Sequence, residues 1–346
     1  MVLVSGAPKD ARLLEDIATE IRRVGGFPLV WLESDRLRRR SIVEVPAEFD
    51  GQIPAWKMRL AESAVAEIVI DSAEEESLLA DVPPARIAAI ERATLPVTRK
   101  LMERGVRQVY VGNELRPTAD RAKRYGMTES ALARVYRAAL DVDYETLEAT
   151  GRTLTQAIES ARKLHLTSPT GTDLTFEVAS RRAYASDGVI SCDDQMRGGA
   201  ALQTWLPAGE AFVSAAPGSA EGRIVVDRDT WDGTEFRHLV LTFHEGRLVS
   251  LTTDSGGERL AAAYAAGGEG KDQFGGIDIG FNPALVAPEG SSMRSYAVAG
   301  NVSFAFGANT WLGGENACDF GFAASLGGTT LAADARAIVR DGEVVK

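Results

Sequence analysis

Histidine is scarce in this 346-residue sequence. The three histidines are His165, His238 and His244, and none follows residue 244. If His238 and His244 share one strand, six residues at ~3.3 Å each separate them by about 20 Å. Two ligands of one zinc ion each lie ~2.0–2.1 Å from the metal. We expect a structural role for His165, which follows a predicted helix whose negative end favours a cation. A histidine-rich two-metal centre is therefore excluded.

Signals for several other protein classes are also lacking. Cys192 and Cys318 lie far apart and form no metal-type pair, which favours a reduced, cytoplasmic setting. No run reaches the ~20 apolar residues that span a bilayer, and the N-terminus has no basic region leading into an apolar core. The net charge of −11 disfavours nucleic acid and anionic membranes as partners. The first strand–helix junctions contain neither G-x-G-x-x-G nor a P-loop, so no nucleotide site of those kinds is predicted.

The N-terminal half alternates between helix and strand patterns. Apolar residues recur with helical spacing from Lys9 to Gly25-Gly26. The predicted strands are 27–32, 66–70 and 106–111, and the predicted helices further along are 85–92, 97–104, 128–140 and 144–163. Strands that alternate with helices indicate an α/β domain with a parallel sheet, here residues 1–165. Asp71 follows a strand, and we expect it to be structural, together with the acidic helix start at 74–76.

From residue 166 to 346, strand patterns and glycine turns replace helical periodicity, which indicates a β-rich, α+β domain. The predicted strands are 174–178, 188–191, 237–243, 247–253, 296–298, 302–306, 337–340 and 343–345. Glu245-Gly246 predicts a hairpin turn between two of them. The stretch 300–328 holds seven glycines and three asparagines. Because glycine suits turns and close backbone contacts, we expect this stretch to form a wall of the active site.

Five segments carry a family resemblance by their order along the chain. They are TDLTF (172–176), WLPAGEAF (205–212), GIDIGFNP (276–283), GNVSFAFG (300–307) and ACDF (317–320). The chain resembles the aminopeptidase T / aminopeptidase S family of metallopeptidases (leucyl aminopeptidases), more weakly in the N-terminal half, where YGMT (125–128) fits. The resemblance implies an aminopeptidase T-like fold, a homodimer, and a two-metal site in the C-terminal domain. Glutamates, histidines and an aspartate hold the metals in that family, and a tyrosine lies nearby.

Carried over by position, most of these ligands are substituted. The glutamate of the P-x-G-E segment is present, but the second glutamate, one histidine, the histidine of the His-x-Asp pair and the tyrosine are not. Glu210 keeps the first glutamate and Asp319 keeps the aspartate. Gly276 stands in place of the second glutamate, and Ser303 in place of one histidine. Ala317 stands in place of the histidine of the His-x-Asp pair, and Thr310 in place of the tyrosine. The same fold includes an iron-dependent dioxygenase of 2,5-dihydroxypyridine, whose two-histidine triad cannot be assembled here either.

Three carboxylates remain as candidates. Glu210 and Asp319 are the predicted catalytic residues, either one acting as a general base if burial raises its pKa. Together with Asp278 they could instead hold Mg²⁺, Mn²⁺ or Ca²⁺, or they could be relics bonded to turn amides. Asp278 is the weakest candidate, because alternation along its strand could turn it away from the side of Gly276.

Polar residues of the same region are the candidates for substrate binding. They are Asn301, Ser303, Asn309, Asn316 and Arg294. The amides need no ionisation to orient a substrate, and an arginine could pair with a substrate carboxylate. Ser303 lacks the elbow motif of a nucleophile. Cys318 has no histidine in local reach, which favours a small buried hydrophobe over a thiolate. The segment 192–195 either lines the site or is a solvated loop.

We therefore predict an enzyme that acts on a peptide-like or amino-acid-derived small molecule by carboxylate acid–base chemistry, without metal or other cofactor. One alternative is a metal-dependent aminopeptidase or amide hydrolase with a carboxylate-only site. The other is a non-catalytic protein that binds a small molecule or peptide. Fold alone does not decide among them, because function lies in the site.

Overall fold

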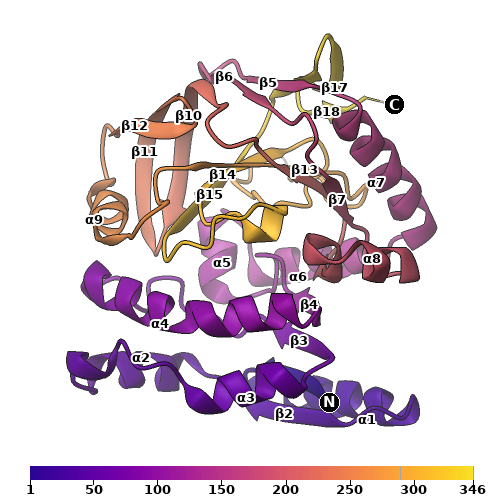
Figure 1. Cartoon of the computed structure of the whole chain (residues 1–346), viewed down its shortest axis with the longest axis vertical. Helices are drawn as coiled ribbons and strands as arrows, with labels where there is room; N and C mark the ends of the chain where they lie inside the picture. Colours follow the sequence, from indigo (N-terminus) through magenta and orange to yellow (C-terminus); the bar gives the residue numbers. More distant parts are fainter. Residues whose placement is uncertain (289, 346) are drawn as a thin grey trace.

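The computed structural model describes residues 1–288 and 290–345, and three sheets organise them. The first is a five-stranded parallel sheet in the order β2-β1-β3-β4-β8, at the bottom of Figure 1. Its strands are β1 (Val2–Gly6), β2 (Pro28–Leu32), β3 (Ala66–Ile70), β4 (Arg107–Val111) and β8 (Gln203–Leu206). The predicted parallel sheet is confirmed, but its fifth strand comes from the C-terminal half of the chain.

Helices flank this sheet and connect it to the rest of the molecule. They are η1 (Pro8–Asp10), α1 (Ala11–Arg23), α2 (Asp35–Val43), η2 (Ala47–Phe49), α3 (Ala55–Ser63), α4 (Pro84–Glu103), α5 (Ala119–Arg124), α6 (Glu129–Leu140) and α7 (Tyr144–Glu159). The Thr128 hydroxyl caps α6 by accepting the N–H of Ala131, as helix starts favour. The two helices predicted at 85–104 are one helix, α4, with Pro96 inside it.

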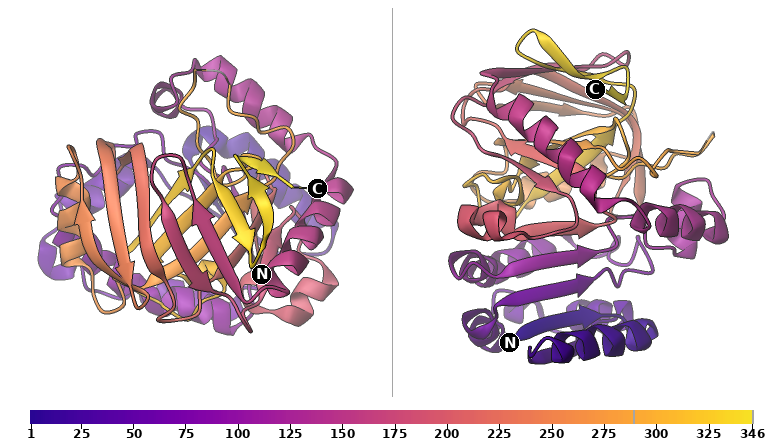
Figure 2. Two further views of the ribbon diagram at one scale, coloured as in Figure 1. Left: turned by 90° about the horizontal axis from the view of Figure 1, so that it is seen from above. Right: turned by 90° about the vertical axis from the view of Figure 1, so that its right-hand side faces the viewer.

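Two antiparallel sheets form a sandwich above the parallel sheet, as Figure 2 shows from the side. The larger has the order β12-β11-β10-β6-β5-β16-β17-β18, and the smaller β15-β14-β13-β9-β7. The larger contains β5 (Lys163–Thr167), β6 (Asp173–Glu177), β10 (Glu221–Trp231), β11 (Thr234–His244), β12 (Arg247–Thr252), β16 (Thr330–Ala333), β17 (Arg336–Arg340) and β18 (Glu343–Val344). The smaller contains β7 (Ala183–Ser186), β9 (Glu210–Ser214), β13 (Phe274–Gly280), β14 (Val302–Gly307) and β15 (Gly321–Leu326). Short helices complete the sandwich: α8 (Cys192–Arg197), η3 (Gly199–Leu202), α9 (Glu258–Ala266) and η4 (Thr310–Leu312).

The main core lies between these two sheets, and alternation along the strands decides what faces it. On β14, Phe304 and Phe306 belong to that core, with Phe176 and Phe236 from the larger sheet. The intervening residue Ala305 belongs to a different cluster, together with Trp205 of β8. The smaller sheet therefore buries one face in the sandwich and turns the other toward the parallel sheet.

Three local predictions were wrong. Helix α7 ends at Glu159, so His165 lies inside strand β5, where its Nε2 is 2.8 Å from Asp173 Oδ1. Residues 188–191 and 296–298 form no strand.

No helix in the described ranges has the length and apolar character needed to cross a bilayer.

Candidate active site

A row of one aromatic and three polar residues crosses the outward face of the smaller sheet. In the strand register, Phe212, Asp278, Ser303 and Ser325 stand opposite one another on β9, β13, β14 and β15. Residues opposite one another in a sheet share a face, and so do residues two apart in one strand. Glu210, two residues before Phe212, therefore points to the same side as Asp278. The expectation that alternation could turn Asp278 away was wrong, because Gly276 and Asp278 are also two residues apart.

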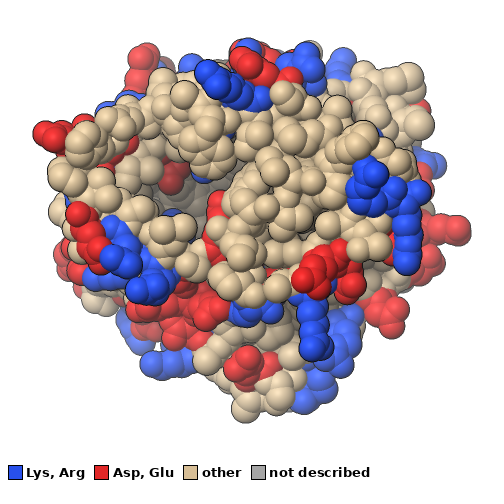
Figure 3. Space-filling view, turned by 90° about the horizontal axis from the view of Figure 1, so that it is seen from below, with Lys and Arg blue, Asp and Glu red and all other residues tan. Residues whose placement is uncertain are grey.

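Glu210 and Asp278 both line a cavity of about 420 Å³ between this face and the parallel sheet. The parallel sheet contributes residues at and just beyond the carboxyl ends of β3 and β4, which is where open parallel sheets place their ligands. The complete lining is Val69, Asp71, Tyr110, Val111, Asn113, Glu114, Gln203, Trp205, Glu210, Asp278, Tyr296 and Trp311. Seen from below, the molecule has a hollow with acidic atoms inside it (Figure 3).

Glu210 is 2% exposed, and Asn113 fixes its orientation. The Asn113 amide donates one N–H to Glu210 Oε1 and the other to the carbonyl oxygen of Pro207. Burial, with a smaller contribution from the charge of Glu114, raises the pKa of Glu210 to about 8 against the lowering effect of the Asn113 hydrogen bond. Glu210 is therefore mostly protonated at neutral pH.

A strained loop after β4 supplies Asn113 and Glu114. Their φ angles are +46° and +58°, in the left-handed region that side chains other than glycine rarely occupy. Ser295 Oγ donates to the carbonyl oxygen of Asn113, and Arg124 pairs with the Glu114 carboxylate at 3.0 Å. Such strain persists where surrounding contacts enforce it, and it is concentrated at functional sites.

Asp278 is 1% exposed, and neither of its carboxyl oxygens accepts a hydrogen bond from the residues that the structure describes. Burial and then the nearby charge of Glu210 raise its pKa well above the usual range. Two neighbouring buried carboxyls cannot both ionise readily, so the titration of each depends on the charge of the other. Glu210 and Asp278 are hereafter called the carboxyl pair.

Asp319, the other predicted catalytic residue, does not line this cavity. It lines a separate cavity of about 350 Å³ beside α4 and α9. Its Oδ1 accepts the N–H of Gly268 at 2.7 Å, and its Oδ2 lies 2.5 Å from Nη2 of Arg92. Burial would raise the pKa of Asp319, but the Gly268 N–H and the Arg92 guanidinium together lower it. Asp319 is therefore an ionised partner in a structural contact.

The predicted substrate-binding amides also have other partners. Asn316 donates to the carbonyl oxygens of Gly270 and Gly307, both at 2.8 Å, and its own N–H donates to Asn309 Oδ1 at 2.8 Å. Both side chains thus hold the β14–β15 connection in place. Ser303 is buried beside Asp278 in the sheet, but its Oγ bonds Ser325 Oγ at 2.7 Å. Asn301 lies just before β14 and is half-buried.

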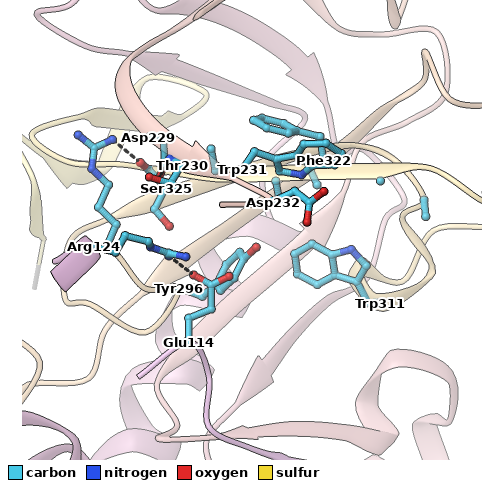
Figure 4. A pocket seen from close by; sticks show the side chains of 16 residues that line it. Glu114, Arg124, Asp229, Thr230, Trp231, Asp232, Tyr296, Trp311, Phe322 and Ser325 are labelled. Carbon is cyan, nitrogen blue, oxygen red and sulfur yellow. Dashed lines mark hydrogen bonds and ion pairs between the residues drawn. The ribbon is translucent and has the colours of Figure 1, made fainter. Parts of the chain in front are cut away.

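Arg294 lines a second cavity, of about 400 Å³, that shares Glu114, Tyr296 and Trp311 with the first. Figure 4 shows Tyr296 and Trp311 on one side of it and Asp229 across from them. Arg294 Nη1 donates to the carbonyl oxygen of Ser325 at 3.2 Å. No carboxylate in the described part of the chain pairs with Arg294 within 4.0 Å, so its guanidinium has donors left for a ligand.

The cysteines lie apart from the carboxyl pair. Cys318 is buried in the main core, and burial raises the pKa of its thiol, which agrees with a small hydrophobic role. Cys192 is exposed at the start of α8, where Ser191 and Asp194 form a capping box. Helix α8 lines another cavity, of about 790 Å³, that shares no lining residue with the cavity of the carboxyl pair. The segment 192–195 is therefore a short capped helix.

A two-metal centre does not fit the residues of this site. Gly276, which takes the place of the second family glutamate, has φ +144°, and a Cβ there would lie 2.1 Å from the Val213 carbonyl oxygen. A glutamate therefore cannot occupy that position without moving the backbone. Within the described residues, no group of three or more histidine, cysteine, aspartate or glutamate side chains could hold a metal ion.

Sequence reasoning missed Asn113, Glu114, Trp205, Tyr296 and Trp311. A signal existed for the first two, because they directly follow the β4 pattern at the carboxyl edge of a parallel sheet. Asp71 had the same signal and does line the cavity, although Arg121 pairs with it at 2.8 Å. The aromatic residues gave no local signal.

Comparison with known proteins identifies related folds. The family of thermophilic metalloproteases (M29) matches residues 1–295. AmpT from Thermus thermophilus has a similar structure, with a TM-score of 0.70 and 18% identity over 100% of this chain and 94% of that one. The 2,5-dihydroxypyridine dioxygenase from Pseudomonas putida KT2440 has a TM-score of 0.62 and 15% identity over 99% and 91%. No curated protein sequence matches the chain.

Proposed function

The chain belongs to the thermophilic metalloprotease (M29) family, and from this premise we propose that it is an enzyme whose carboxyl pair replaces the family's metal chemistry. It acts on a peptide-like or amino-acid-derived small molecule by acid–base catalysis. The observation that carries the proposal is the placement of Glu210 and Asp278, both buried, on adjacent strands and in one cavity. Acid–base catalysts are tuned in this way, by burial and by a neighbouring like charge.

The two carboxyls have different roles in this proposal. Asn113 donates to Glu210 Oε1, so that oxygen acts as an acceptor and the proton of Glu210 is carried on Oε2. With a pKa of about 8, Glu210 is the general acid at neutral pH. Asp278 has no protein donor and is the group that receives a proton from the substrate. In each turnover Glu210 therefore donates one proton and Asp278 accepts one. Transfer of a proton from Asp278 back to Glu210 restores the starting state.

Arg294 provides the second point of substrate contact. It lines the cavity next to the carboxyl pair, and the two cavities share three residues. A guanidinium with free donors binds a carboxylate through two parallel hydrogen bonds. A substrate with a carboxylate at Arg294 would place its reacting atoms toward Glu210 and Asp278, and this supports an amino-acid-derived substrate.

The test is turnover of dipeptides and N-substituted amino acids by purified protein, before and after dialysis against a chelator, with metal content measured in parallel. We expect turnover that survives chelation. Glu210→Gln and Asp278→Asn should each lower kcat by about 10²-fold or more, the usual contribution of a positioned acid or base. Zinc or iron at one or two equivalents per chain, with activity lost on chelation, would instead support the metal-dependent hydrolase.

Asp319→Asn is the matched control, because it removes a buried carboxylate outside the cavity. It should leave kcat within about twofold of the parent, because Asp319 does not line the cavity of the carboxyl pair. If Glu210→Gln and Asp278→Asn also leave turnover unchanged, the acid–base proposal fails, and a binding protein becomes the better interpretation.

A further inference from the structure

We infer that the cavity beside the carboxyl pair binds a small organic amine in its protonated form, with an apolar or aromatic body. This inference deepens the proposed function, because it names the charged group that the same cavity recognises. It rests on the proposed function only where turnover is concerned. Four features carry the inference: an unpartnered carboxylate, an uncompensated negative charge, an aromatic wall and a suitable volume.

The unpartnered carboxylate is Asp278. A buried carboxylate without a donor loses its hydration and gains nothing in return, which costs several kcal/mol. Neither oxygen of Asp278 has a donor among the described residues, although the side chain lines the cavity. Both oxygens therefore keep unused acceptor positions. A ligand N–H is the natural donor for them.

The charge of the lining is one-sided. It contains four carboxyls, Asp71, Glu114, Glu210 and Asp278, and no lysine, arginine or histidine among its described residues. Asp71 and Glu114 are neutralised from outside the lining by Arg121 and Arg124. The carboxyl pair has no such partner in the lining, so whatever negative charge it carries is not compensated there by a protein cation. An anionic ligand would be repelled at this point, whereas a cation would be attracted.

The wall beside the pair is aromatic. Trp205 and Trp311 meet edge to face at 6.2 Å between ring centroids, and Tyr296 and Trp311 at 6.0 Å. Tyr110 stacks on Trp205 at 5.8 Å. Ring faces attract organic ammonium groups, and most strongly those of tryptophan. A metal ion gains little from such a wall and needs more oxygen donors than the two carboxyls that face it here.

The cavity holds about 420 Å³, within the range of small-molecule sites. A phenylethyl body with one ammonium group fits such a space. Phenethylamine, 2-phenylethanol and phenylacetate have nearly the same shape but carry a positive, a neutral and a negative group. They therefore separate the contribution of charge from that of the apolar body.

The experiment is isothermal titration calorimetry of the full chain at pH 7 with these three probes, with tryptamine and benzylamine, and with Mg²⁺, Mn²⁺, Ca²⁺ and Zn²⁺ alone. We expect at least one amine to bind about tenfold or more tighter than the neutral alcohol, as hydrogen bonds to charged groups do. Asp278→Asn should remove this preference, while Asp319→Asn should keep it. Trp311→Leu, which leaves the carboxyls intact, should weaken amine binding several-fold.

Equal binding of the alcohol or of phenylacetate overturns the inference, and so does the absence of binding by all three amines at millimolar concentration. Tight binding of a divalent ion that Asp278→Asn abolishes would also overturn it. If Asp278→Asn does not fold, the amine-to-alcohol ratio of the unaltered protein and the Trp311→Leu variant still decide. Amine binding without any effect of Glu210→Gln on turnover would uphold this inference and defeat the proposed function.

Discussion

Replacing Gly276 by alanine tests whether the backbone, and not chance substitution, excludes the family's second glutamate. A Cβ at this position would lie 2.1 Å from the carbonyl oxygen of Val213 and 2.8 Å from the Cα of Ser214. Both atoms belong to the backbone of β9, so the strand itself must shift. Because β9 begins at Glu210, the same shift would disturb the carboxyl pair.

The expected cost has two parts. A backbone in the glycine-only region costs about 1–3 kcal/mol for any other residue, and overpacking a buried site costs typically 1–3 kcal/mol more. Gly276→Ala should therefore lower the free energy of unfolding by about 2–6 kcal/mol. Gly198 is the matched control, because its φ is +65° but nothing lies within 4 Å of a Cβ there. Gly198→Ala should cost about 1–3 kcal/mol, the cost of the glycine-only backbone alone.

Urea unfolding at pH 7 measures both variants, with stability taken from the midpoints if the slopes agree. A loss for Gly276→Ala within about 1 kcal/mol of the loss for Gly198→Ala would refute the steric argument. Gly276→Glu provides the stronger test. If that variant folds with the parent's stability and retains stoichiometric zinc, the site has room for the family's chemistry and the reasoning is wrong.

Three further predictions concern the carboxyls and their partners. Between pH 4.5 and about 8, folded Glu210 keeps a proton that the unfolded chain releases. The free energy of unfolding should therefore fall as pH rises, by up to ~1.4 kcal/mol per pH unit. Glu210→Gln should flatten this slope in urea unfolding, and parallel curves for the two proteins would contradict the prediction. Asp319→Asn should lose about 1 kcal/mol with its Arg92 contact yet keep normal turnover, and a tenfold loss of kcat would return Asp319 to the catalytic residues. Asn113→Gly keeps the left-handed backbone but removes the hydrogen bond that lowers the pKa of Glu210. The alkaline limb of the pH–rate profile should therefore move to higher pH. An unmoved limb would exclude Asn113 as the positioning residue of Glu210.

Local patterns predicted much of the fold. The hairpin at Glu245-Gly246, the Thr128 cap and the alternation of helix and strand in the N-terminal half all follow from short-range chemistry, and the structure agrees. The predicted division at residue 165 says nothing of β8, which pairs with β4 in parallel, Gln108 opposite Gln203, across about a quarter of the chain. Such a pairing depends on tertiary packing and leaves no local pattern.

Only candidate-site residues that lie within a recognisable sequence segment could be predicted from the sequence. Glu210 was predicted through its P-x-G-E segment, and the structure buries it beside a cavity. Its hydrogen-bond partner Asn113 lies 97 residues earlier, and no spacing rule connects them. Asp319 was predicted because glycines and asparagines surround it in sequence, but it lines a different cavity from Glu210. In the structure, that setting is a network of side chains and backbone that holds a loop.

The register of β13 explains how a carboxyl pair arises on this fold. Gly280 stands opposite Glu210, Asp278 opposite Phe212, and Gly276 opposite Ser214. At ~3.3 Å per residue, a carboxylate at position 276 would lie about 13 Å along the strand from the Glu210 row, and one at 278 only about 7 Å. At the longer separation the two carboxyls would affect each other's ionisation only weakly. At the shorter one, the charge of Glu210 adds to burial in raising the pKa of Asp278. Moving one acidic residue by two positions along the same face of the strand thus couples the ionisation of the two carboxyls.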